Sequence, residues 1–263
     1  TPGTDGLFIL SLIHPLMKAG KIDLTYLSQF TNAPCLVNAD PESDEHGLLL
    51  RDDAGKLLVI DRTTGKPTPF DQKGVRPDLG ATHEVDGVAH RTVFQHMAER
   101  YLSPEYAPEA VAERCGIPAT RIRAIAGEIA RVAFDEAISL DTEWTDFRGE
   151  THKTMTGRPV SFHSMRGISA HANGFQTCRA LHVLQIILGT VEVPGGFRFK
   201  PPYPKPPEAH PKPHCGVTPG KPLNGPHLGF VHGPQDLALK DDGSPARIDK
   251  AFSWEHPILQ HVH

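Results

Sequence analysis

The chain has 263 residues, enough for one large domain or two small ones. Its formal net charge of -4 gives no electrostatic reason to expect binding to nucleic acid or to an anionic membrane. No apolar run approaches the ~20 residues that a helix needs to cross a bilayer. The apolar run of residues 7–13 has no basic region before it and no small-residue cleavage site after it, so it does not predict a signal peptide.

In the first part of the chain the pattern predicts two helices and a β-hairpin. Residues 2–20 have the spacing of a buried helix, and residues 23–30 that of a short helix capped by Asp23. Two strand-like runs then flank Ala54-Gly55, which predicts a hairpin within an insertion at about residues 45–80.

The middle of the chain is predicted to be mainly helical. A strand and turn lead into a helix that ends near Leu102, with Thr92 as its N-cap. Two helices, at residues 108–115 and 120–133, follow around the turn Gly116-Ile117-Pro118. This pair has the outline of a DNA-binding helix-turn-helix. Its few arginines are offset by glutamates in an acidic chain, which argues against DNA binding.

A polar cluster precedes the most informative stretch of the chain; it consists of Trp144, Asp146, Arg148, Glu150, His152 and Lys153. Two carboxylates and a histidine are residue types used in acid–base catalysis. No nucleophile or metal motif accompanies them, so we predict a solvated loop.

Residues 157–197 combine three features: a β-prone run at residues 160–162, a polar loop at 164–174 and an apolar helix closed by Gly189. Strand, glycine loop and helix is the order in which α/β proteins hold an anionic ligand at a helix N-terminus. The candidate ligand-contacting residues of the loop are Arg166, Gly167, Ser169, His171, Asn173 and Gly174. An ordinary strand–helix connection is the alternative, and on residue types alone the two remain open.

The run RGISAHANGFQTCRALHVLQIILGTVEVPGGFRFKPPYPKP resembles molybdopterin oxidoreductases of the dimethyl-sulfoxide-reductase family, and within it the sulfite dehydrogenase, polysulfide reductase and tetrathionate reductase branch. The sequence Pro-Gly-Thr-Asp before the first helix is similar to that family's guanine-binding element. The resemblance implies that Gly3, Thr4 and Asp5 bind the cofactor together with the loop residues Gly167, Ser169, His171, Asn173 and Gly174. It also makes His171 and Arg166 candidates to lie near the pterin and the metal.

The implied function is that of an internal fragment of a molybdenum catalytic subunit. Such a fragment would hold molybdenum-bis(molybdopterin guanine dinucleotide) for redox of an inorganic sulfur compound (sulfite, polysulfide, thiosulfate or tetrathionate) or of formate. The partners that the resemblance implies are a membrane anchor subunit together with an iron–sulfur electron-transfer subunit. An iron–sulfur cluster is expected only upstream of this chain, and no metal ligand within it. The start at Thr-Pro-Gly, without an initiator Met, fits a fragment.

The fold predicted from these features is α/β: residues 1–197 form the back part of a Rossmann-like, molybdopterin guanine dinucleotide-binding domain. Residues 198–263 form an extended, proline-rich connection to the next domain. His210, His214 and Cys215 raise a zinc question there, but their spacing matches no closed ligand set.

The four cysteines of the chain are widely spaced and form no C-x-x-C pair. They therefore predict neither a zinc ribbon nor an iron–sulfur site. Reduced cysteines favour the cytoplasm. The periplasm would follow if a twin-arginine signal lay upstream.

The alternative function is a stand-alone α/β nucleotide-binding or interaction module without redox activity. The strand–loop–helix pattern fits it as well. No phosphate-binding G-x-x-x-x-G-K-[ST] loop is present to support it.

Overall fold

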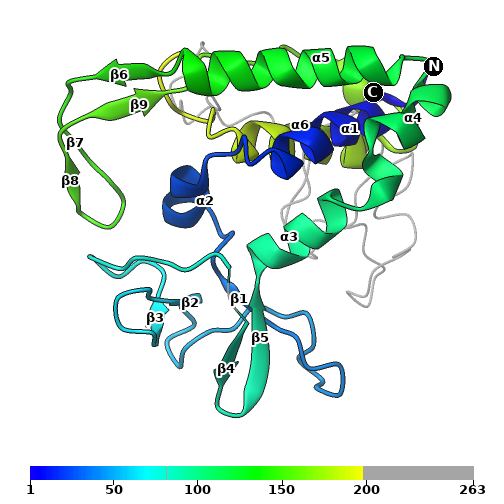
Figure 1. Cartoon of the computed structure of the whole chain (residues 1–263). Coiled ribbons are helices and arrows are strands. Elements are labelled where there is room, and N and C mark those ends of the chain that lie inside the picture. Colours follow the sequence, from blue (N-terminus) through cyan, green and yellow to red (C-terminus); the bar gives the residue numbers. More distant parts are fainter. Residues whose placement is uncertain (81, 198–263) are drawn as a thin grey trace, which may run out of the picture. The chain divides into compact units, whose positions relative to one another are not determined.

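The computed structural model of the chain describes residues 1–80 and 82–197. Helices dominate this part (Figure 1). They are α1 (Asp5–Lys18), α2 (Leu24–Phe30), α3 (Val93–Tyr101), α4 (Pro108–Cys115), α5 (Ala119–Ala130) and α6 (Gly174–Ile187). Two 3₁₀ turns, Pro104–Tyr106 and Arg166–Ser169, and a π-helical turn, Arg131–Asp135, join them.

The main core lies between the helices. Helix α1 packs most extensively on α6 and also on α5 and α4. Both faces of α1 are apolar, and Leu12, Ile13 and Leu16 are at most 3% exposed. On α6, Leu184 and Ile187 are fully buried against them. A helix that is apolar nearly all round needs neighbours on several sides, and α1 has them.

The strands form small antiparallel sheets. They are β1 (Leu36–Asn38), β2 (Leu58–Ile60), β3 (Pro67–Pro69), β4 (His83–Val85), β5 (Val88–Thr92), β6 (Ile138–Leu140), β7 (Trp144–Thr145), β8 (Thr151–His152) and β9 (Met155–Gly157). One sheet has the order β1-β5-β4, and the pairs β2-β3, β6-β9 and β7-β8 are separate. Leu36 pairs with Thr92 and Val37 with Arg91 in the first sheet.

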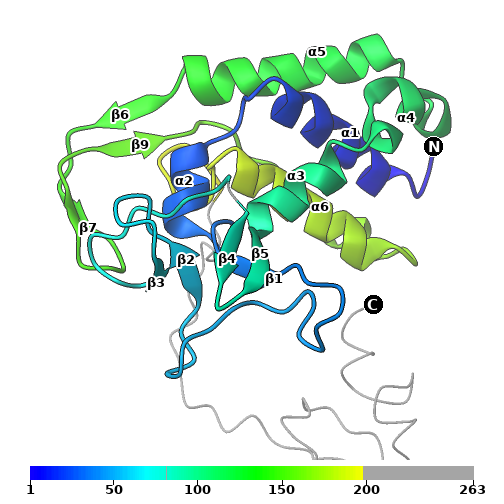
Figure 2. The ribbon, with the colours of Figure 1, turned by 60° about the horizontal axis from the view of Figure 1, so that its bottom comes forward.

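Residues 138–157 form a two-stranded arm that leads away from the end of α5 and returns toward α6 (Figures 1 and 2). Its base is the β6-β9 pair and its far end the β7-β8 pair, where Trp144 pairs with His152. We call this segment the arm.

The general class, helices with small sheets, agrees with the α/β prediction, but the Rossmann-like part of that prediction is not confirmed. Every named strand pair among the described residues is antiparallel. The strand predicted at residues 160–162 is wrong. The Val160 N–H turns back to the Arg158 carbonyl at 2.7 Å, and the side chains of Val160 and Phe162 pack on the helical core. Apolar residues here reflect packing on helices, not a place in a sheet.

Several local predictions are confirmed. Asp23 caps α2, with its carboxylate accepting from the Tyr26 N–H at 2.8 Å. Thr92 caps α3 in a capping box with Gln95. The hairpin turn at Ala54-Gly55 forms, with the Asp52 N–H donating to the Lys56 carbonyl. The predicted division at residue 197 stays a prediction, and His210, His214 and Cys215 lie outside the described residues.

Candidate functional site

The two segments singled out in the sequence as ligand-binding lie together at the start of two parallel helices. The Asn173 side-chain amide donates to the Gly3 carbonyl at 3.1 Å, across 170 residues of sequence. One turn further along, Gly6 of α1 faces Thr177 of α6. At the other end, the Asp23 N–H donates to the Ile187 carbonyl, so α1 and α6 run in the same direction. We call the segments 3–7 and 173–176 the paired helix starts.

Gly6 and Gly174 leave no room for a side chain in this packing. A Cβ on Gly6 would lie 2.9 Å from the Thr177 hydroxyl oxygen. A Cβ on Gly174 would lie 2.0 Å from the Ser169 carbonyl oxygen, which no real side chain allows. The loop of residues 166–172 is therefore folded directly onto the first turn of α6.

Neither helix start is capped by a side chain. The Thr4 hydroxyl donates to the Thr1 carbonyl instead, and Asn173 is bonded to Gly3. Among the described residues, the backbone N–H groups of Asp5, Gly6, Leu7, Phe175 and Gln176 have no hydrogen-bond acceptor. Uncapped N–H groups and two helix dipoles pointing the same way favour an anionic group at this place.

Among the described residues, no side-chain hydrogen bond or ion pair ties Asp5, Arg166 or His171 to another part of the chain. Asp5 is exposed, and its carboxylate has no partner among the described residues. Arg166, Gly167 and Ser169 lie in the exposed 3₁₀ turn, where the Ser169 hydroxyl donates to the Arg166 carbonyl at 2.9 Å. His171 is exposed in the turn that leads to Asn173. The structure thus brings Gly3, Thr4, Asp5, Asn173 and Gly174 together, while the roles of these residues stay predictions.

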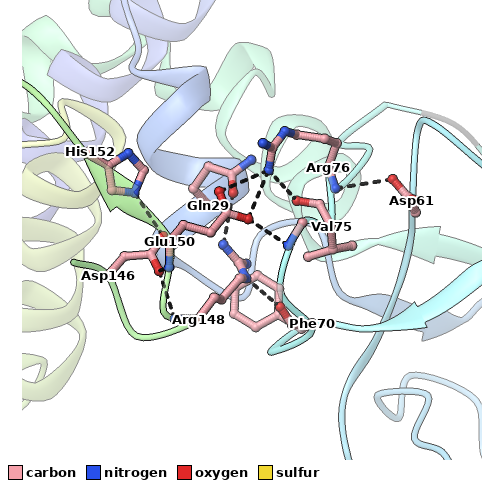
Figure 3. Close-up of polar contacts among 10 residues, drawn as sticks. Gln29, Asp61, Phe70, Val75, Arg76, Asp146, Arg148, Glu150 and His152 are labelled. Carbon is pink, nitrogen blue, oxygen red and sulfur yellow. Dashed lines mark hydrogen bonds and ion pairs between the residues drawn. The ribbon is translucent and has the colours of Figure 1, made fainter.

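The polar cluster of residues 144–153 is not the solvated loop that was predicted. Arg148 is 6% exposed, and the Asp146 side chain is 3% exposed. The Arg148 guanidinium lies 4.5 Å from the ring centroids of both Phe70 and Phe147. Its Nε donates to the Phe70 carbonyl at 2.7 Å and its Nη1 to the Gln29 amide oxygen at 2.9 Å (Figure 3). The side-chain partners of Arg148, Gln29 and Phe70, lie far from it in sequence, so no local pattern pointed to its burial.

We call Asp146, Arg148, Glu150 and His152 the arm clasp, because they fasten the far end of the arm to α2 and to residues 70–76. Asp146 accepts from the Arg148 and Glu150 N–H groups and from His152 Nε2, the last at 3.0 Å. Glu150 accepts from the Gly74 N–H at 2.7 Å and from Arg76 Nη1 (Figure 3).

The ionisation of the clasp follows from these contacts. Burial raises the pKa of the Asp146 carboxyl, but hydrogen bonds from His152 and from two backbone N–H groups outweigh it, so that pKa lies below its ordinary value. The Gly74 N–H and Arg76 lower the pKa of the Glu150 carboxyl. Burial lowers the pKa of the Arg148 guanidinium, which nevertheless stays charged near neutral pH.

Donor atoms of Asp146, Glu150 and His152 lie within 4.8 Å of one another, a spacing that a metal ion could use. The carboxylate oxygens already accept from protein N–H groups, and Arg76 and Arg148 bring positive charge to the same place. A cation would have to displace these donors. We therefore interpret the three residues as a hydrogen-bonded group that holds the arm in place.

No protein-family model matches the chain. The chain is similar to a subunit of the sulfite dehydrogenase from Allochromatium vinosum, with 42% identity over 273 aligned residues. The alignment covers 99% of this chain and 28% of that relative, so the chain spans a little over a quarter of the relative's length.

This comparison corrects two predictions. The assignment to the dimethyl-sulfoxide-reductase family of molybdopterin oxidoreductases is not upheld, because the relative found belongs to a sulfite dehydrogenase and no family model supports the wider assignment. The predicted function, that of a fragment of a molybdenum-bis(molybdopterin guanine dinucleotide) catalytic subunit, is not upheld for the same reason. The comparison shows similarity to a sulfite dehydrogenase subunit.

Besides the domain division, the predictions of the cofactor, of the individual site residues and of the compartment stay predictions. Among the described residues, no helix combines the length and the apolar character needed to cross a membrane.

Proposed function

We propose that this chain is a component of a multi-subunit oxidoreductase that oxidises or reduces an inorganic sulfur compound. Sulfite is the first candidate for that compound. The identity of 42% to a sulfite dehydrogenase subunit over nearly the whole chain supports this role. It also favours a redox role over a nucleotide-binding module without one. The electron-carrying partner is proposed to be an iron–sulfur subunit, which would take up or deliver the electrons of the sulfur reaction.

The contribution of this chain is proposed to be ligand binding at the paired helix starts, and one observation carries that proposal. Two parallel helices begin side by side with uncapped backbone N–H groups, and an unpaired carboxylate, that of Asp5, stands at the same place. A phosphate group would accept from the N–H groups. A guanine base would donate its ring N–H and its amine to the Asp5 carboxylate in a bidentate pair.

These residues fit the guanine and phosphate parts of a redox cofactor such as a pterin guanine dinucleotide. Gly3, Thr4 and Asp5 would hold the base, and Asn173 and Gly174 would present the α6 N–H groups to a phosphate. Ser169, Gly167, Arg166 and His171 would border the ligand from the adjoining loop. When bound, such a cofactor supplies the electron transfer, while this chain binds and orients it.

The test is a titration of the full chain with GDP, followed by calorimetry, with ADP for comparison. We expect GDP to bind and Asp5→Asn to weaken it by about tenfold, because the variant loses a charge-assisted bidentate pair. The matched control is Asp53→Asn, since Asp53 is also exposed and without a partner among the described residues. Binding of ADP equal to that of GDP would contradict the role of Asp5.

The redox role is tested with the same variants in the complete enzyme. Sulfite-dependent reduction of ferricyanide should fall with Asp5→Asn and persist with Asp53→Asn. GDP binding by the chain without any sulfite-dependent activity in the complete enzyme would retain the ligand site and reject the sulfur reaction.

A further inference from the structure

A groove of about 570 Å³ lies apart from the paired helix starts. Its walls are α2, the arm and the segment 189–193 that follows α6. This volume is typical of sites for small organic ligands.

One wall of the groove is a row of aromatic rings. The ring centroids of Tyr26 and Phe30 are 5.8 Å apart, and those of Phe30 and Trp144 are 5.9 Å apart. The His152 ring stacks on Trp144 with a centroid distance of 4.4 Å and an interplanar angle of 20°. The row extends the aromatic surface from α2 onto the arm.

The polar ends of these rings are already bonded. The Tyr26 hydroxyl donates to the Val191 carbonyl at 3.2 Å, and Trp144 Nε1 donates to the Thr154 carbonyl at 3.0 Å. These bonds hold the rings in place, and what remains for a ligand is their apolar surface.

The charges around the groove disfavour an anion. The basic side chains that line it among the described residues are Arg158 and His152. Arg158 donates to the Asp23 carboxylate through Nε at 3.0 Å and Nη2 at 2.8 Å, and His152 is bonded to Asp146. The Arg158–Asp23 pair is mostly buried, with side chains 15% and 12% exposed. Because both basic side chains are paired, an anionic ligand would meet no unpaired cation among the described residues. Glu192 adds a carboxylate to the lining.

Neutral hydrogen-bond donors are available instead. The Gln29 amide oxygen accepts from Arg148, which fixes the amide, while its nitrogen donates to no described residue. Thr154 and Thr156 also line the groove, and their hydroxyls make no hydrogen bond with described residues. Such donors match carbonyl oxygens on a ligand.

We propose that this groove binds an uncharged planar ring compound with carbonyl oxygens, laid against the aromatic row of Tyr26, Phe30 and Trp144. The ring would pack on the apolar surface, and its carbonyl oxygens would accept hydrogen bonds from Gln29, Thr154 and Thr156. An uncharged ligand needs no counter-charge, and the basic side chains of the lining are already paired. A quinone ring and a flavin ring share this chemistry. The groove does not depend on the ligand of the paired helix starts.

The experiment is equilibrium dialysis of the full chain against menadione, a quinone, and lumiflavin, a flavin ring without phosphate. We expect saturable binding of at least one, which identifies the source of the ring. Naphthoquinone sulfonate, a charged relative of menadione, should bind about tenfold more weakly than menadione if menadione is the ligand, because its charge is unpaired in the groove.

Two variants locate the binding. Trp144→Leu should weaken it by about fivefold or more through loss of ring contact. Thr156→Val should weaken it by about threefold through loss of a hydrogen bond. Thr145→Val is the matched control, an exposed threonine of the arm that does not line the groove, and should bind as the unchanged chain does.

If circular dichroism shows that Trp144→Leu is unfolded, the proposal is tested by comparing the binding affinities of Thr156→Val and Thr145→Val. The proposal is overturned if neither ring compound binds saturably, or if Thr156→Val and Thr145→Val bind alike. GDP binding at the paired helix starts would be unaffected by either outcome.

Discussion

Arg148 joins three parts of the chain through one side chain. Its guanidinium donates to Phe70 and to Gln29 and lies between two phenylalanine rings, while its Nη2 is buried and has no acceptor among the described residues. A buried charge costs desolvation free energy, and its hydrogen bonds offset that cost.

Replacing this arginine tests which effect is larger. Arg148→Met keeps the length and apolar stem but leaves the Phe70 carbonyl and the Gln29 amide oxygen without their donor. We expect the free energy of unfolding to fall by about 1–3 kcal/mol. Urea unfolding measures this, with Arg62→Met as control, because Arg62 is exposed and its side chain makes no hydrogen bond or ion pair with described residues. An equal or higher stability for Arg148→Met would mean that the buried charge is a net cost.

The clasp also makes acid stability depend on Asp146. Its pKa is lowered in the folded chain, so the unfolded chain binds the proton more readily. The stability that Asp146 contributes is therefore complete above the ordinary value of 3.8 and is lost as the pH falls through the lower folded value.

Asp146→Asn removes this titration. We expect a lower free energy of unfolding at neutral pH and a shallower decline between about pH 5 and about pH 3 than in the unchanged chain. Glu150 keeps its own contribution, so some decline persists. Urea unfolding across this range measures it, and Asp53→Asn should follow the unchanged chain. A decline as steep in Asp146→Asn as in the unchanged chain would contradict the assignment.

At the scale of elements, the close packing at the starts of α1 and α6 depends on a glycine in each helix. A methyl group on Gly174 would meet the Ser169 backbone, and one on Gly6 would meet Thr177. Gly127, inside α5, is exposed, and a methyl group there would have no described atom within 4 Å. Replacing glycine by alanine should therefore lower the free energy of unfolding at position 174 and raise it at position 127.

Gly174→Ala is expected to lower the free energy of unfolding by about 1–3 kcal/mol through overpacking. Gly127→Ala, the control, should raise it by about 0.5–1 kcal/mol, because alanine is the better helix former. Thermal or urea unfolding of both variants measures this. If both variants gained stability, the loop of residues 166–172 would not be held against α6 as described.

Local elements were predictable from sequence where a short-range rule decides them. The caps at Asp23 and Thr92 follow from side chains that bond backbone N–H groups within three residues. The turn at Ala54-Gly55 follows from glycine's freedom to take a positive φ, here +78°. Residues 160–162 were not predictable in this way, since an apolar run looks alike whether it packs on helices or lies in a sheet.

At the scale of the whole molecule, some of the residues predicted to bind a ligand lie close together, although their role stays a prediction and the predicted Rossmann-like sheet is not confirmed. Gly3, Asp5, Asn173 and Gly174 were singled out together, and the structure brings them to one place. The expected parallel sheet does not accompany them, because these residues lie at the starts of two helices rather than at the end of a strand. The burial of Arg148 was missed, since its partners, Gln29 and Phe70, are far away in sequence.

Those distances in sequence bear on the order of events in folding. The bonds of Arg148 close intervals of 119 and 78 residues. Closing so long a loop costs chain entropy before the contact contributes anything, so such contacts form late. Interactions absent from the folding transition state act mainly on the rate of unfolding. Weakening the arm clasp should therefore speed up unfolding, and so shorten the lifetime of the folded chain, while its rate of folding stays nearly unchanged.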